Sequence, residues 1–167
     1  MPPETNGDGA GICSSIPKEL IVDASILFSF FKADSARRNI FKKLLEQECK
    51  LVSPDFILKE LSNNKSGIIK FANINEDEFN DILLELSSDL DTFNEGQYKD
   101  FLSEANKISP HEGETKDDPY FALALAFNFP VWSDEAAFKQ QSRIKVLNTK
   151  ELLELLKKPK KSPESRD

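Results

Sequence analysis

The alternation of short apolar segments with longer helical segments most constrains how this chain can fold. Apolar runs occur at residues 19–23, 49–53, 129–133 and 144–148, with a weaker one at 91–93. Within these runs polar and apolar residues do not alternate regularly, which is typical of strands that are covered on both faces. Because helical segments separate the runs, the pattern predicts a mainly parallel sheet with helices on both sides.

The segments between the runs carry the sequence signatures of helices. Helices are predicted at residues 34–48, 54–64, 75–89, 95–109, 118–128 and 149–158. The segment 118–128 is apolar almost all round, which predicts a buried helix. Ser53 and Pro54 form a typical helix start, and Thr149 is the expected cap of the last helix. The middle of the chain, at about residues 62–113, is mostly helical and is expected to form an arm on the core.

The charge of the chain restricts how it could handle nucleic acid. The net charge is −7, and the segment from Lys157 onward carries five basic and two acidic residues, so the preceding 156 residues sum to −10. An acidic body of this kind repels phosphate. A function on nucleic acid would therefore need a local basic strip, or bound cations that reverse the sign at the site.

Composition predicts one domain with a tail at each end. Residues 1–18 are polar and rich in Gly, Pro and Ser, and residues 157–167 are basic and polar. We expect both to be disordered, on either side of a single domain at 19–156. No apolar run approaches the roughly 20 residues of a membrane span, so no membrane association is expected. Cys13 and Cys49 form no CxxC motif, so we expect neither disulfides nor a zinc site and predict a cytoplasmic protein.

Acidic residues stand where a parallel sheet forms its sites, outside the carboxyl ends of the strands and at the adjoining helices. These residues are Asp23, Glu60, Asp117, Asp118, Asp134 and Glu135. If they converge, their negative charges would be unstable together unless hard divalent cations bind among them. Because sites made only of oxygen ligands suit Mg²⁺ or Mn²⁺, the pattern predicts a site for one of these ions.

Each acid also has a purely structural explanation. Asp23 could cap the helix that follows it. Asp118 directly precedes Pro119 and is a natural N-cap, which would leave Asp117 to point elsewhere. Glu60 could extend into water from the edge of its helix.

Four segments that contain these acids resemble the four acidic motifs of PIN-domain nucleases. The segments are IVDASILFSFF, SPDFILKEL, DDPYFALALAF and VWSDEAAF. They occur in the order of the family motifs and extend over about residues 19–156. The resemblance implies a three-layer α/β/α sandwich, often dimeric, that cleaves single-stranded or structured RNA. Family members include toxins of toxin–antitoxin pairs and RNA-processing enzymes.

The first three motifs match the family position by position. The resemblance assigns Asp23, Glu60 and Asp117 to the metal-binding acids. The third family motif places its acid two residues before a proline, which favours Asp117 over Asp118, although both remain candidate ligands. Ser25 matches the small polar residue that follows the first acid by two positions and supports it.

The fourth motif departs from the family pattern. That pattern begins with Ser or Thr and places acids at its third and fifth positions, whereas the same register here reads SDEAAF from Ser133. Glu135 replaces the usual first Asp, and Ala137 stands where the second acid would be. Asp134 could replace the usual first Asp from one position earlier. We therefore predict that Asp134 and Glu135 jointly bind metal, supported by Ser133, and that the second metal position is the one in doubt.

Together these observations predict a Mg²⁺- or Mn²⁺-dependent endoribonuclease. The expected catalytic residues are Asp23, Glu60, Asp117 and Asp134, the expected substrate is RNA, and the expected assembly is a homodimer. Two alternatives remain open. One is a PIN-like module for RNA binding or protein interaction, with catalysis weakened by the altered fourth motif. The other is a toxin whose partner is an antitoxin protein.

A short basic segment follows the first strand. Arg37, Arg38, Lys42 and Lys43 lie on one predicted helix and could form a local strip that holds the RNA backbone. Such residues more commonly form a solvated helix face, and that interpretation is favoured.

Overall fold

The computed structural model describes residues 15–33, 35–110 and 115–158, and it contains a five-stranded parallel sheet. The strands are β2 (Glu19–Val22), β3 (Lys50–Pro54), β4 (Asp91–Phe93), β5 (Val131–Trp132) and β6 (Val146–Leu147). Their order across the sheet is β4-β3-β2-β5-β6, and each neighbouring pair is parallel. The predicted α/β class with a parallel sheet is therefore confirmed.

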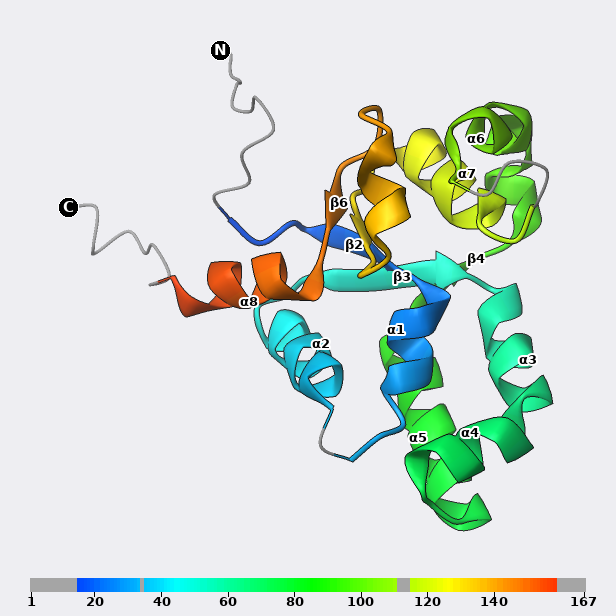
Figure 1. The fold of residues 1–167 in the computed structure, drawn as a ribbon, viewed down its shortest axis with the longest axis vertical. Helices are drawn as coiled ribbons and strands as arrows, with labels where there is room; N and C mark the ends of the chain where they lie inside the picture. Colours follow the sequence, from blue (N-terminus) through cyan, green and yellow to red (C-terminus); the bar gives the residue numbers. More distant parts are fainter. Residues whose placement is uncertain (1–14, 34, 111–114, 159–167) are drawn as a thin grey trace.

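Helices cover both faces of the sheet (Figure 1). One face carries α1 (Ala24–Ser29), α2 (Ala36–Glu46), α3 (Phe56–Asn63), α4 (Lys65–Ala72), α5 (Glu76–Asp89) and α8 (Thr149–Lys157). The other face carries α6 (Leu102–Ile108), α7 (Asp118–Phe127) and the 3₁₀ turns η1 (Glu95–Gln97), η2 (Lys99–Phe101) and η3 (Ala136–Gln140). This arrangement is the expected three-layer α/β/α sandwich.

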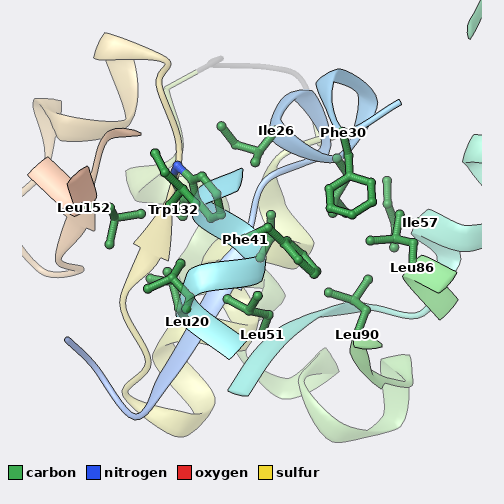
Figure 2. Close-up of a cluster of buried hydrophobic side chains, with 14 of the residues drawn as sticks. Leu20, Ile26, Phe30, Phe41, Leu51, Ile57, Leu86, Leu90, Trp132 and Leu152 are labelled. Carbon is green, nitrogen blue, oxygen red and sulfur yellow. The ribbon is translucent and has the colours of Figure 1, made fainter. Parts of the chain in front are cut away.

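Successive residues of β2, β3, β5 and β6 fill two hydrophobic layers. Leu20 belongs to the layer under α1, α2 and α8, whereas its neighbour Ile21 belongs to the layer under α7. In the first layer, shown in Figure 2, the rings of Phe30 and Phe41 pack edge to face at 4.8 Å, and Trp132 of β5 is fully buried. Because both faces of the sheet are covered, its strands need apolar residues at consecutive positions.

The middle of the chain does not form a single helical arm. α4 and α5 belong to the first face, where Phe79 and Leu86 are buried. β4 then extends the sheet at one edge, and α6 packs against α7 on the opposite face. The physical reason is that Tyr98 and Ala105 are buried in the second layer, so the chain has to pass the sheet edge between α5 and α6.

β3 continues further than the sequence pattern indicates. The pattern places a helix start at Ser53 and Pro54, but both residues pair with β4, and Pro54 stands opposite Phe93. The N-cap position of α3 is taken by Asp55 instead. A proline at the last position of a strand removes only one donor from the ladder, so the strand tolerates it there.

α8 is capped one residue earlier than the sequence pattern indicates. Asn148, and not Thr149, occupies the N-cap position, and its side chain accepts a hydrogen bond from the N–H of Glu151 at 2.8 Å. The Glu151 carboxylate in turn accepts from the N–H of Asn148 at 2.8 Å, which completes a capping box. The hydroxyl of Thr149 is thereby available to accept from Trp132 and to donate to Asp134.

The predicted tails lie largely outside the described residues, since 1–14 and 159–167 are not described. The domain boundaries at 19 and 156 stay predictions. Among the helices of the described residues, none is long and apolar enough to cross a membrane.

Candidate functional site

Asp23 lies at the carboxyl end of the central strand β2. It is 4% exposed, and its backbone N–H donates to the carbonyl of Trp132 in β5 at 3.1 Å. Its Oδ2 atom accepts hydrogen bonds from the hydroxyls of Ser25 at 3.0 Å and Ser133 at 2.9 Å. Asp23 occupies the N-cap position of α1, as considered from the sequence, but its side chain makes no capping hydrogen bond there.

The environment of Asp23 disfavours an isolated negative charge. Burial raises the pKa of its carboxyl above the usual value, hydrogen bonds from Ser133, Ser25 and the N–H of Ala24 oppose this rise, and the nearby carboxylate of Glu135 adds to it. A buried carboxylate whose donors are neutral is costly in its charged form. A cation in the adjacent space would offset this cost.

Three further carboxylates line one cavity together with Asp23. Glu60 comes from α3, Asp117 from the start of α7 and Glu135 from the segment after β5. The cavity has a volume of about 420 Å³. Asp117 is buried, Glu135 is half-buried and Glu60 is exposed. The structure thus brings four of the six sequence-predicted acids to one cavity at the carboxyl edge of the sheet.

Asp118 does not line this cavity, in contrast to the prediction that it joins the metal ligands. Its carboxylate oxygens accept hydrogen bonds from the side-chain amide of Asn106 and the hydroxyl of Ser109, both at 2.8 Å. Asp118 is also not the N-cap of α7, which the sequence predicted it to be. Asp117 occupies that position, and Asp118 is the first helical residue. One step along a helix turns the side chain by roughly 100°, so two consecutive acids face different surroundings. Asp118 therefore ties α7 to α6.

Asp134 does not line the cavity either. Its carboxylate accepts hydrogen bonds from Nε of Arg37 at 2.8 Å, from the N–H of Thr149 at 2.6 Å and from the Thr149 hydroxyl. Burial alone would raise the pKa of Asp134, but these hydrogen bonds and the Arg37 charge lower it below the usual value. Asp134 thus joins β5 to α2 and α8, and Glu135, one residue further on, lines the cavity in its place.

The four basic residues on α2 do not form an open strip. Arg37 and Lys42 pair with acidic side chains of other elements. Nε of Arg38 donates to the carbonyl of Phe30 at 2.7 Å. Lys43 is exposed. Three of these four side chains are therefore engaged in contacts within the protein, so a role of this segment in RNA binding stays a prediction.

Several residues of the cavity wall are not acids and were missed by sequence reasoning. They include Phe28, Phe56, Lys116 and Tyr120. Tyr120 is 2% exposed, and its ring packs edge-on against that of Phe56 with the centroids 6.0 Å apart. Helical spacing contains a signal for both residues. Tyr120 follows Asp117 by three positions, and Phe56 precedes Glu60 by four, so each lies on the same helix side as a candidate acid.

The donor set fits Mg²⁺ or Mn²⁺ in kind, because all four acids offer oxygen. Within the described part of the chain, however, no three His, Cys, Asp or Glu side chains are arranged to hold a metal ion. Mg²⁺ keeps several waters and is commonly bound by one or two carboxylates together with substrate phosphates, so a complete protein cage is not required. Asp23 is the acid whose burial most favours a cation beside it.

These features define a three-layer α/β protein with an acidic cavity at the sheet edge where such folds bind their ligands. A family model described as PIN domain matches residues 21–157. Because the match covers most of the chain, this protein belongs to the PIN-domain family, and the resemblance seen in the sequence is confirmed. PIN domains are generally nucleases, which places the chain in a family of nucleases. A search of curated proteins found no match.

Proposed function

We propose that this protein is an endoribonuclease that hydrolyses RNA with the help of bound Mg²⁺ or Mn²⁺. The observation that carries the proposal is the cavity in which Asp23, Glu60, Asp117 and Glu135 come together from four separate segments. Membership of the PIN-domain family supports the nuclease class. The acidic surface alone would not attract RNA, so a cation at this cavity is the natural way to reverse the local charge.

Asp23, Glu60 and Asp117 are the residues that would hold the cation, with Glu135 at the same cavity. When bound, such a cation lowers the pKa of a bound water and stabilises the charge that develops on the phosphate. Two serine hydroxyls fix the Oδ2 atom of the Asp23 carboxylate and so orient this side chain at the cavity. Glu60 is exposed and can move toward the cavity when a ligand enters.

The cavity wall offers two features that suit single-stranded RNA. Lys116 is exposed beside Asp117 and supplies a positive charge that can contact a phosphate oxygen. Phe28 and Phe56 add aromatic surface on which an unpaired base could stack. A base in a continuous duplex is already stacked on its neighbours, so this wall favours unpaired RNA next to the bond that is cleaved.

The proposal is tested by incubating the purified protein with unstructured and with structured RNA, in Mg²⁺, in Mn²⁺ and in chelator. We expect cleavage only when a divalent cation is present, and a loss of about 100-fold or more in Asp23→Asn. Asp81→Asn, which changes an exposed acid of α5, is the matched control and should cleave like the wild type. Cleavage that continues unchanged in Asp23→Asn would assign the activity to another site or to a contaminant.

A binding module for RNA or protein is the second candidate function. In its favour, Asp134 of the fourth motif is engaged by Arg37 and Thr149, and Ala137 stands where the family has an acid. Such a module would bind RNA equally well with cation and with chelator, and would not cleave it. An antitoxin partner and a homodimer stay predictions, which co-purification and a mass measurement in solution would check.

A further inference from the structure

One buried hydroxyl in the candidate site has no partner within the described chain. Tyr120 lies in the first turn of α7, is 2% exposed and lines the cavity together with the acids. Its ring is held by edge-on packing against Phe56. The hydroxyl oxygen is inaccessible to solvent and makes no hydrogen bond with any residue that the structure describes.

An unpaired buried hydroxyl destabilises a folded chain, and such groups are uncommon in native proteins. Phenylalanine at position 120 would fill almost the same space without this cost. Ser53 of β3 is close enough to the phenol to lower its pKa by hydrogen bonding, yet neither of the two hydroxyls has a partner in normal hydrogen-bond geometry among the described residues. The protein itself therefore does not satisfy the polar end of Tyr120, which points to a ligand as the missing partner.

The surroundings keep this hydroxyl a neutral donor. Burial raises the pKa of Tyr120 well above its usual value, the carboxylates of Asp23, Glu60 and Asp117 raise it further, and only the Ser53 hydroxyl opposes this rise. The phenol consequently keeps its proton, which it can donate in one hydrogen bond. Because neither these carboxylates nor the Ser53 hydroxyl receives that bond in normal geometry, an oxygen atom that enters the cavity could be its acceptor.

We propose that the Tyr120 hydroxyl donates a hydrogen bond to an oxygen held in the cavity, either a water on the bound cation or a non-bridging phosphate oxygen of the RNA. This inference rests on the proposed function and adds a residue to it. Tyr120 orients that oxygen without itself being a metal ligand. A donor in a buried site of low polarity interacts more strongly with such an oxygen than it would in water.

The test compares Tyr120→Phe with Tyr98→Phe. The first substitution removes only the hydroxyl and keeps the ring that packs against Phe56. The second removes the hydroxyl of another buried tyrosine, 3% exposed, which does not line the cavity. Three quantities are measured for each variant: the Mn²⁺ affinity by calorimetry without RNA, kcat and KM for RNA cleavage, and the temperature of unfolding without metal.

We expect Tyr120→Phe to lower kcat about 10- to 100-fold, as for other residues that orient a ligand, while Tyr98→Phe cleaves like the wild type. The metal-free Tyr120→Phe protein should unfold at the same temperature as the wild type or higher. A Mn²⁺ affinity reduced about 10-fold without RNA would identify the acceptor as a water on the cation. An unchanged Mn²⁺ affinity together with the loss in kcat would identify the phosphate oxygen.

Failure of this inference differs from failure of the proposed function. If the wild type does not cleave RNA, the proposed function fails. The role of Tyr120 is then tested by two binding measurements. RNA affinity is compared between Asp23→Asn and Asp23→Asn/Tyr120→Phe, and Mn²⁺ affinity is measured in the single Tyr120→Phe variant. Weaker binding of either ligand upon loss of the hydroxyl supports the role of Tyr120. Unchanged affinity for both ligands, with unchanged kcat wherever cleavage occurs, would overturn it. A lower unfolding temperature with unchanged ligand binding would replace it with a purely structural role.

Discussion

Asp23 and Asp134 are two carboxylates at the same edge of the sheet with very different surroundings. They follow β2 and β5, which are neighbouring strands. Asp23 is buried, receives hydrogen bonds from two neutral serine hydroxyls and has a raised pKa. Asp134 receives the Arg37 guanidinium and both donors of Thr149, and its pKa is lowered. The same chemical group therefore costs stability at one position and contributes stability at the other.

The difference between these acids lies in what balances the negative charge. Asp134 has its counter-charge within the chain, in Arg37, and so it joins three elements of the fold. The hydrogen-bond donors of Asp23 are neutral, so a cation from solution is the partner that would balance its charge. Substitutions at the two positions should consequently move stability in opposite directions, and only those at Asp23 should abolish cleavage.

The largest expected change in stability is the one caused by Asp134→Ala. It leaves the Arg37 guanidinium and the N–H of Thr149 without their acceptor, and we expect the free energy of unfolding to fall by about 2 kcal/mol. Urea denaturation measures this change, and Asp81→Ala, at an exposed position, should stay within about 0.5 kcal/mol of the wild type. RNA cleavage per folded molecule should change little. If Asp134→Ala lost as much RNA cleavage as Asp23→Asn, Asp134 would belong to the catalytic site.

A smaller loss is expected for Asp118→Asn, which tests the acid next to Asp117. An amide can accept one of the two hydrogen bonds from Asn106 and Ser109 but not both, so the free energy of unfolding should fall by about 1 kcal/mol. Calorimetry should give the same Mn²⁺ affinity as for the wild type. A drop in that affinity of about 10-fold would restore Asp118 to the metal ligands and weaken the contrast between cavity acids and structural acids.

Asp23→Asn should change stability in the opposite direction. The variant removes a buried negative charge, so the metal-free protein should unfold at a higher temperature, by no more than about 4 °C. Added Mn²⁺ should raise the unfolding temperature of the wild type, because it binds only the folded state, and should raise that of the variant much less. Calorimetric scans with and without Mn²⁺ give both values. A lower unfolding temperature in the absence of metal would contradict the account of Asp23.

The smallest expected effect is a difference in pH dependence between the two sites. The pKa of Asp134 is lowered on folding, so its contribution is fully present above its unfolded pKa of about 3.8 and is lost as the pH falls through the folded pKa. The pKa of Asp23 is raised, so the cost of its charge is fully present above the folded pKa and disappears as the pH falls to about 3.8. Without metal, wild type and Asp23→Asn differ in the free energy of unfolding, and so do wild type and Asp134→Ala. As the pH falls, the first difference should therefore shrink at a higher pH than the second. Urea denaturation from pH 3 to 7 would show the order, and the reverse order would contradict it.

Much of the fold was predictable because the strands are short and apolar at consecutive positions. Leu20 and Ile21 are adjacent in the sequence and are buried on opposite faces of the sheet, which only a sheet covered on both sides allows. The starts of helices were less predictable. Pro54 is as compatible with the end of a strand as with the first turn of a helix, and its pairing with Phe93 of β4, far along the chain, decides between them.

Part of the candidate site was also predictable from the sequence. Strand ends and helix starts carry Asp23 and Asp117 to the sheet edge, and helical spacing brings Glu60 to the same cavity. Tyr120 was not identified, because its spacing of three positions from Asp117 is a weak signal in a helix whose residues are apolar almost all round. Its role in the wall depends on the position of the acids around its hydroxyl, which come from three elements.

The sequence by itself determined the parallel α/β architecture, the family, and the segments that supply acids to the cavity. The sequence already favoured Asp117 over Asp118, whereas only the tertiary structure decided that Glu135, instead of Asp134, reaches the cavity. The physical reason is that neighbouring side chains point in different directions, and each is held by partners remote in sequence. Arg37 lies 97 residues before Asp134, whose charge it balances. The residues next to Asp134 in the sequence therefore do not indicate that its charge has a partner.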